Sequence, residues 1–263
     1  MRHCPHLLRA KVEIAMVGIE RRRRGEMNQL EVMPGLLITN QLCAVLKDQG
    51  TLVICDLHIG YESVLECEGL HLPRIQTETM RESLLDIIDR YSPDSFLILG
   101  DLKHEFSRNL TQEWSEARRI LGTLQDHGEV LIVRGNHDNY LANIATRLGI
   151  RLVEEYGASG IFFAHGHLPN KNRPLVMGHE HPSVRLFDSV GAYVKLPCFV
   201  HFEREQVLVM PAFSPLAAGT DITSGAQAMS PVLYDADLSL AKLYGCSEIG
   251  ILSLGEAGKL RRP

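Results

Sequence analysis

The chain of 263 residues contains no apolar run close to the roughly 20 residues that a membrane-spanning helix needs. Its first residues also lack the apolar segment and small-residue cleavage site that mark a secreted protein. We therefore expect a cytoplasmic protein with no membrane partner.

Paired cysteines and excess positive charge are also missing. The six cysteines are scattered without a CxxC pair, which predicts reduced, mostly buried thiols rather than a disulfide framework or a zinc knuckle. The formal net charge of −5 disfavours an unspecific basic nucleic-acid binder, but it leaves room for an enzyme that acts on nucleic acid. No platform of aromatic and basic residues is evident along the sequence, which favours small substrates.

The first 26 residues differ from the rest because they contain a run of arginines at positions 21–24. Such runs are usually solvated tails, and a nucleic-acid-binding arm is the alternative. We expect residues 1–26 to form a basic, flexible extension and residues 27–263 to form a single domain. A start of translation at Met27 is a further hypothesis.

Apolar patterning predicts alternating strands and helices from Leu36 onward. Apolar residues recur at the helical period over 76–91, 111–126 and 139–148. Between these segments lie strand-like runs at 51–55, 96–99, 130–133 and 150–153. Later runs, without helices, lie at 161–164, 174–177, 198–202, 207–210 and 249–252. The order predicts an α/β fold in which two packed sheets with flanking helices form a sandwich.

Five short polar patches each follow a strand-like run. They are Asp56-Leu57-His58, Gly100-Asp101, Gly135-Asn136-His137-Asp138, His165-Gly166-His167 and Gly178-His179-Glu180-His181. Ligands of open α/β sheets bind outside the carboxyl ends of the strands, so we expect the patches to converge. In extended backbone, the i, i+2 spacing within the first and last patches would place both side chains on one face.

The side chains of the patches suit divalent cations. Carboxylates, imidazoles and a carboxamide, without thiolates, are typical ligands of Mn²⁺, Fe, Zn²⁺ or Co²⁺ and not of a structural cysteine zinc site. Five patches of this kind predict a site for two neighbouring cations.

The order DxH, GD, GNHD, H and GHxH resembles that of the calcineurin-like metallophosphoesterase superfamily, over residues 56–181. Residues 56–62, 100–104 and 178–182 further resemble its ICC-like branch. That branch is related to SbcD-type nucleases and includes the DNA-ligase-associated DNA-damage-response endonucleases of bacteria and archaeal homologues. The resemblance implies a metallophosphoesterase sandwich and a metal-dependent phosphoric ester hydrolase.

The resemblance also implies a binuclear metal centre in which Asp101 bridges two ions, with Mn²⁺ the preferred metal. One ion would be held by Asp56, His58, Asp101 and His181, and the other by Asp101, Asn136, His165 and His179. A hydroxide shared by the ions would attack phosphorus in line.

His137 matches the superfamily's catalytic histidine, and we expect Asp138 to hold its second ring nitrogen. His165 and His167 are alternatives for the lone histidine ligand, and His165 is preferred because it directly follows a strand. His167 would then face substrate or lie in a loop. Candidate contacts to a substrate phosphate are Lys103, His104, Arg108 and Arg134, with solvated surface positions as the alternative.

These patterns favour a phosphodiesterase or nuclease that acts on DNA or RNA, with a role in repair implied by the resemblance alone. A phosphomonoesterase or small-nucleotide phosphodiesterase is the second hypothesis. A non-catalytic, metal-stabilised interaction scaffold is the third, since some members of the superfamily have lost their chemistry. A homodimer and repair-protein partners are also implied only by the resemblance.

Overall fold

The computed structural model describes residues 28–70, 73–104, 111–188, 190–217, 219–225 and 227–260, without the side chains of Cys67 and residues 111–113. The expected basic extension at 1–26 lies outside these residues, and so does Arg108. None of the helices in the described ranges is long and apolar enough to span a membrane.

The first half of the chain forms a seven-stranded sheet whose spatial order follows the sequence. Its first four strands pair antiparallel, and from the fourth onward the pairing is parallel. The strands are β1 (Gln29–Met33), β2 (Leu36–Thr39), β3 (Ala44–Leu46), β4 (Thr51–Ile54), β5 (Ser95–Leu99), β6 (Glu129–Val133) and β7 (Arg151–Val153). The parallel part aligns the carboxyl ends of β4, β5 and β6 along one edge.

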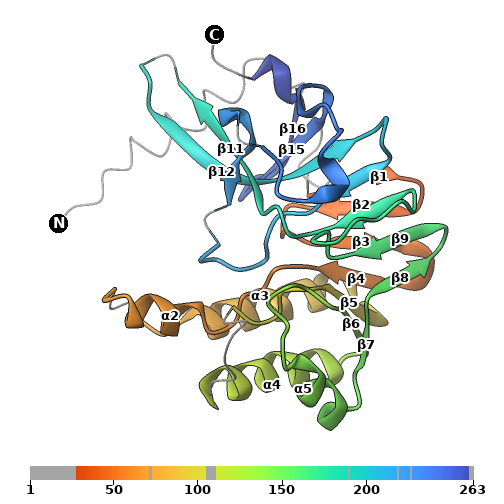
Figure 1. Cartoon of the computed structure of the whole chain (residues 1–263), viewed down its shortest axis with the longest axis vertical. Helices are drawn as coiled ribbons and strands as arrows, with labels where there is room; N and C mark the ends of the chain where they lie inside the picture. The colour runs from red at the N-terminus through yellow and green to blue at the C-terminus, as the bar shows by residue number, and fades with distance from the viewer. Residues whose placement is uncertain are drawn as a thin grey trace.

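Helices cover one face of this first sheet (Figure 1). They are α3 (Gln76–Tyr91), α4 (Thr111–Gln125) and α5 (Leu141–Leu148), while the short α2 (Tyr61–Cys67) follows the first polar patch. In α3, residues Met80, Leu84 and Ile87 recur at the helical period and pack against the sheet in one apolar cluster. The helix ends where Ser92 adopts a left-handed conformation.

The second half of the chain forms a nine-stranded mixed sheet. Its main order is β14-β11-β12-β13-β10-β9-β8, and β15 and β16 join through β12. The strands are β8 (Glu155–Ala158), β9 (Ile161–Ala164), β10 (Leu175–Met177), β11 (Pro182–Phe187), β12 (Tyr193–Phe202), β13 (Val207–Val209), β14 (Thr220–Asp221), β15 (Lys242–Ser247) and β16 (Gly250–Glu256).

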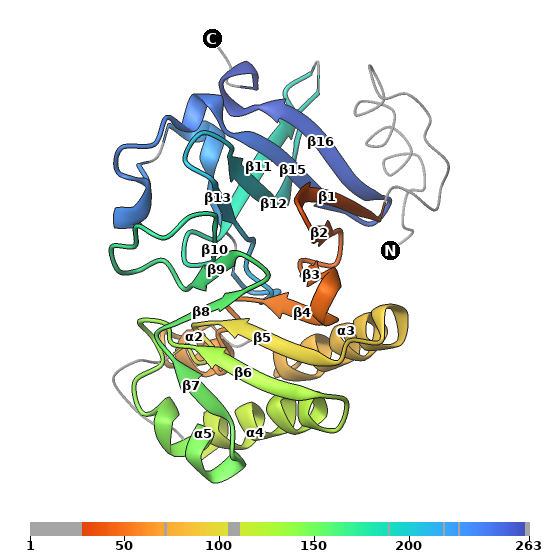
Figure 2. The same cartoon turned by 90° about the vertical axis from the view of Figure 1, so that its right-hand side faces the viewer.

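The two sheets pack face to face (Figure 2). Between them lies an apolar core to which Val53, Leu97, Phe163 and Phe199 contribute fully or almost fully buried side chains. The outer face of the second sheet packs against loops and short 3₁₀ helices. The described 3₁₀ helices are η2 (Lys47–Gln49), η3 (Ile222–Ser224), η4 (Pro231–Leu233), η5 (Leu238–Leu240) and η6 (Ala257–Lys259).

The predicted α/β sandwich of two sheets with flanking helices is confirmed. The structure adds that, among the described residues, α-helices cover only the first sheet. The sequence patterns missed β1, β2, β3, β8, β11, β14, β15 and the helix α2. Most of these elements have only two to six residues, which is too short for a hydrophobic period to stand out.

We expect the buried thiols to be unreactive in the folded protein. Burial raises the pKa of the Cys43 thiol to about 12 and that of Cys198 well above its usual value, so little thiolate forms. Mass-spectrometric mapping of alkylated peptides should find both residues unmodified in native protein and modified in denatured protein. Rapid alkylation of either residue without denaturant would contradict this packing.

Candidate metal centre

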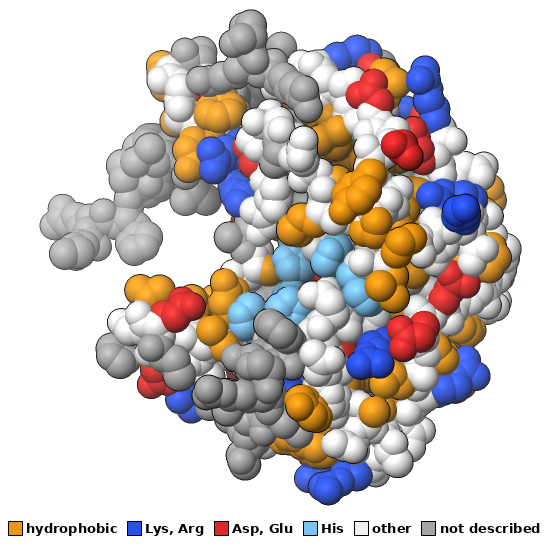
Figure 3. Space-filling model, viewed as in Figure 1, with side chains coloured by type: hydrophobic (Ala, Val, Ile, Leu, Met, Phe, Trp, Pro, Cys, Tyr) orange, Lys and Arg blue, Asp and Glu red, His pale blue; other side chains and the backbone are white. Residues whose placement is uncertain are grey.

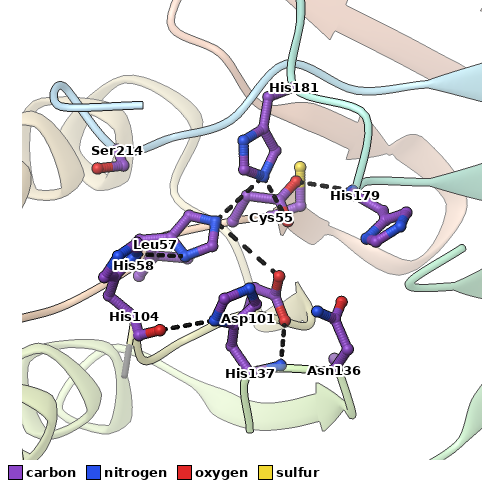
Figure 4. A network of polar contacts seen from close by, with 12 residues as sticks. Cys55, Leu57, His58, Asp101, His104, Asn136, His137, His179, His181 and Ser214 are labelled. Atoms are coloured by element: carbon purple, nitrogen blue, oxygen red, sulfur yellow. Dashed lines mark hydrogen bonds and ion pairs between the residues drawn. The ribbon is translucent and has the colours of Figure 1, made fainter. Parts of the chain in front are cut away.

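The five polar patches meet where the two sheets join. Figure 4 labels residues from four of them. Asp56 and His58 follow β4, Asp101 follows β5, and Asn136 and His137 follow β6. From the second sheet, His165 follows β9, and His179 and His181 follow β10. The predicted convergence of the patches at the carboxyl ends of strands is therefore confirmed, and each sheet supplies part of the site.

A first group of candidate ligands consists of Asp56, His58, Asp101 and His181, whose ligand atoms lie within 4.8 Å of one another. The Nε2 atoms of His58 and His181 are 3.1 Å apart. Oδ1 of Asp56 lies 3.3 Å from Nε2 of His181. These are the residues that the resemblance to the superfamily assigns to one ion.

A second group shares Asp101 with the first and adds His165 and His179 within the same limit of 4.8 Å. Nε2 of His165 lies 3.3 Å from Oδ2 of Asp101 and 3.2 Å from Nδ1 of His179. The side-chain oxygen of Asn136 lies 3.1 Å from the same Nε2 atom. The second predicted ligand set is thus also brought together, and Asp101 belongs to both.

The ring of His165 is oriented by a backbone carbonyl. Its Nδ1 lies 2.9 Å from the carbonyl oxygen of Leu99, which can only accept, so Nδ1 carries the proton and Nε2 faces the carboxylate. His167 lies outside both groups, with its ring centroid 5.2 Å from that of His165. Of the two alternatives, the structure therefore places His165 among the candidate ligands.

The backbone at five candidate ligands is left-handed rather than extended. Positive φ, between 44° and 70°, occurs at Asp56, His58, Asp101, His179 and His181. Asp and His tolerate this region better than most residues, but each instance costs roughly 1–3 kcal/mol. The expectation of extended i, i+2 pairs is thus wrong, because tight turns aim these side chains. Asp56 and His58 still join one group, whereas His179 and His181 join different groups.

Glycines in the patches make room for these turns. A Cβ on Gly178 would lie 2.5 Å from Oδ2 of Asp56. A Cβ on Gly135 would collide with both the carboxylate and the backbone nitrogen of Asp101. The glycine of one patch therefore packs directly against the candidate ligand of another, which explains why the pattern needs glycine at these positions.

Electrostatics among the candidate ligands are dominated by the buried carboxylates of Asp56 and Asp101. Burial opposes protonation of His165, but its hydrogen bond to Asp101 and the charge of Asp56 raise its pKa to about 9. Burial lowers the pKa of His58 to about 3 and that of His179 to about 4. Burial opposes protonation of His181 as well, but the charge of Asp56 and a hydrogen bond to it raise the pKa of that ring. His58 and His179 are thus poised to offer a lone pair, whereas His165 and His181 are held close to the carboxylates of Asp101 and Asp56.

This arrangement fits a pair of divalent cations. Oδ1 of Asp56 is buried and makes no hydrogen bond within the described part of the chain, although it points into the first group. Buried carboxylates and mutually facing imidazole nitrogens would otherwise be costly, and a cation would satisfy both. The oxygen and nitrogen donors suit Mn²⁺, Fe, Zn²⁺ or Co²⁺ alike.

His137 lies beside the first group, with its ring centroid 5.2 Å from that of His58. Its backbone N–H donates to Oδ1 of Asp101, and its Nδ1 donates to the carbonyl of His104 at 2.6 Å. Asp138 does not contact this ring, so the expected Asp138–His137 pair is wrong. The Asp138 carboxylate instead accepts from the backbone N–H groups of Leu102, Lys103 and Gly135. Its pKa is raised to about 6 by burial and by the charge of Asp101.

The expected substrate contacts occupy different environments. His104 lies at the site, 3.4 Å from His58 between Nδ1 atoms, and stacks on Tyr61 at a centroid distance of 3.8 Å. Lys103 is fully buried. Arg134 is exposed and forms an ion pair with Glu154. Arg108 lies outside the described residues.

Several supporting residues carry no signal in the sequence. The buried Gln76 side chain donates to the carbonyl of His58 and to the hydroxyl of Ser214, whose backbone N–H donates to the carbonyl of Asp56. Glu62 accepts from the backbone N–H groups of Ile75 and Gln76. The only sequence signal for these supporting roles would be a position close to one of the five patches. Of these residues, only Glu62 lies close to a patch in the sequence.

Two overlapping Asp/His groups at the carboxyl ends of strands in a two-sheet sandwich fit the class of metal-dependent phosphoric ester hydrolases. The family model for calcineurin-like phosphoesterases matches residues 51–242, more than half of the chain. The chain therefore belongs to this family. No curated protein matches it by sequence.

Among solved structures, the chain is similar to the nuclease MPE of Pseudomonas putida, with 22% identity and a TM-score of 0.60. The match covers 87% of this chain and 100% of that one. At this identity the similarity establishes the fold. The phosphoesterase Yfce of E. coli matches with 16% identity and a TM-score of 0.36, over 75% of this chain and 88% of that one. This second similarity is too weak to support a conclusion.

We expect Gly135→Ala to displace Asp101, because the added Cβ would occupy the space of its carboxylate. Metal analysis after loading with Mn²⁺ and desalting should show less bound metal than in wild type, and turnover should fall roughly 100-fold for a misplaced ligand. Gly122→Ala is the matched control, since nothing lies within 4 Å of its Cβ on α4. Full metal content in Gly135→Ala would refute the steric role of this glycine.

Proposed function

We propose that the protein is a two-metal phosphodiesterase that cleaves nucleic acid, with Mn²⁺ as its preferred metal. The observation that supports this most directly is the position of Asp101 in two adjoining ligand groups. A surface hollow with histidine side chains at its base gives a polymer access to these groups (Figure 3). The fold shared with the Pseudomonas putida nuclease adds support.

We divide the candidate ligands between two cations as the resemblance implies. Asp56, His58, Asp101 and His181 would hold one cation, and Asp101, Asn136, His165 and His179 the other. Bound there, the two ions would supply a water activated for attack on phosphorus and would neutralise charge on the phosphoryl oxygens.

His137 is proposed as the proton donor to the leaving oxygen. Its Nδ1 proton is committed to the carbonyl of His104, so a protonated ring keeps that bond and presents its second proton on Nε2. The bond from the His137 backbone to Asp101 links the position of this ring to the shared carboxylate. The presence of His137 beside a full ligand set argues against a non-catalytic scaffold.

The net charge of −5 favours a smaller phosphate ester as the second candidate substrate. Cytoplasmic location, dimerisation and repair partners remain predictions.

The proposed function is tested by adding Mn²⁺ back to metal-stripped protein and measuring hydrolysis of a chromogenic phosphodiester, the matching monoester and defined DNA and RNA oligonucleotides. Mn²⁺-dependent cleavage of the diester and of an oligonucleotide is the expected result. Turnover of the monoester alone would replace the nuclease with a phosphatase. Two bound ions without any turnover would favour the scaffold.

Replacing His137 with alanine should leave metal binding intact and lower turnover of the diester by about 10²–10⁴-fold, as expected for loss of a general acid. Metal content and diester hydrolysis are measured on the same preparation. His127→Ala serves as the control, because His127 is an exposed histidine whose ring hydrogen-bonds to the carbonyl of Thr123. Unchanged turnover in His137→Ala would exclude the assigned role.

A further inference from the structure

The hairpin of β11 and β12 carries a basic pair beside an aromatic pair. Arg185 lies opposite Lys195, and Phe187 lies opposite Tyr193. Directly opposed residues in an antiparallel pair point to the same face, and so do residues two apart. All four side chains therefore share one face of the hairpin. Tyr193 is 54% exposed and is more accessible than Phe187.

The other face of the hairpin is used by the core. Val184, Leu186 and Leu196 pack in the apolar cluster on the outer side of the second sheet. The face with Arg185 and Tyr193 is consequently turned away from that cluster and is not needed for packing against it.

The basic and aromatic face runs directly from the metal centre. β11 begins immediately after His181, and Ser183, Lys195 and Pro197 line a cavity of about 240 Å³ together with His181. In the cartoon the hairpin projects from the body of the molecule, and in the space-filling view from the same side it borders the hollow that holds the histidines (Figures 1 and 3). At about 3.3 Å per residue, the strip from His181 to Phe187 is roughly 20 Å long.

The side chains on this strip are arranged for contact with bases and phosphates. The Arg185 guanidinium lies 5.0 Å from the centroid of the Tyr193 ring, and the Phe187 and Tyr193 rings are 5.5 Å apart. Arg185 also forms an ion pair with Asp221, in which the arginine side chain is 41% exposed and the aspartate side chain 9% exposed, and Lys195 donates to the carbonyl of Gly219. The ion pair uses the Nε side of the guanidinium, which has further N–H donors that can bind a phosphate.

We propose that this face of the β11–β12 hairpin binds single-stranded nucleic acid and leads it to the metal centre. A base stacks on Tyr193, and Arg185 and Lys195 contact backbone phosphates. An unpaired strand fits because stacking requires an exposed base face, which a duplex does not offer. The inference rests on the proposed nuclease function and specifies its substrate.

The central test compares Tyr193→Ala with wild type on two Mn²⁺-dependent substrates, a labelled single-stranded oligonucleotide and a chromogenic diester too small to reach the hairpin. Loss of a stacked base should weaken oligonucleotide binding roughly tenfold or more, measured by fluorescence anisotropy, and raise KM for its cleavage. Hydrolysis of the small diester should stay at the wild-type rate. Tyr193→Phe should restore binding, because stacking needs the ring and not the hydroxyl.

Val194→Ala is the matched control, since Val194 is next in sequence, also exposed, and opposite Leu186 on the other face of the hairpin. It should bind the oligonucleotide like wild type. For Arg185→Ala, the slope of log affinity against log salt should become shallower by about 0.7, the value for one phosphate contact to a single strand.

The outcomes separate this inference from the function on which it rests. If wild type cleaves oligonucleotides and Tyr193→Ala binds and cleaves them equally well, the nuclease stands and the hairpin surface is refuted. If wild type hydrolyses the small diester but neither binds nor cleaves oligonucleotides, both proposals fall. If Tyr193→Ala instead converts a dimer into a monomer without changing oligonucleotide affinity, the hairpin is an interface between copies of this chain and the inference is overturned.

Discussion

The site depends on the contacts of the Asp101 carboxylate, which join residues of the first sheet to residues of the second. Its two oxygens face different sets of neighbours, since Oδ1 accepts from the backbone of His137 and Oδ2 lies against His165 from the other sheet. The Asp101 carbonyl also accepts from the backbone N–H of His58. The position of one acidic residue therefore fixes the relative placement of three patches that are distant in sequence.

The surrounding protein compensates for an arrangement that is unfavourable in itself. Left-handed backbone at five residues and two buried carboxylates both destabilise the folded state. The apolar core between the sheets holds the strand ends in place, and Asp138 ties the turns after β5 and β6 through three backbone N–H groups. Strain of this kind persists where the packing around it leaves no alternative, which is typical of functional sites.

The sequence was most informative where chemistry and strand ends coincide. The alternation of apolar runs with patches such as Gly100-Asp101 predicted both the sandwich and the meeting of the patches. It could not indicate the left-handed turns at Asp56 and His181, because no local pattern distinguishes them from extended backbone. The shared face of Arg185 and Tyr193 was invisible for another reason: it arises from the pairing register of two strands, one too short to be recognised. These residues are separated in the sequence, so they did not stand out as a platform of aromatic and basic residues.

The division of the candidate ligands between the sheets has a consequence for how the protein matures. A chain that has emerged from the ribosome only as far as β7 possesses Asp56, His58, Asp101 and Asn136, but it lacks His165, His179 and His181. Neither ligand group is complete until the second sheet has docked onto the first. Cations bound at these ligands would therefore be captured late in biogenesis, and they would stabilise only a correctly assembled sandwich.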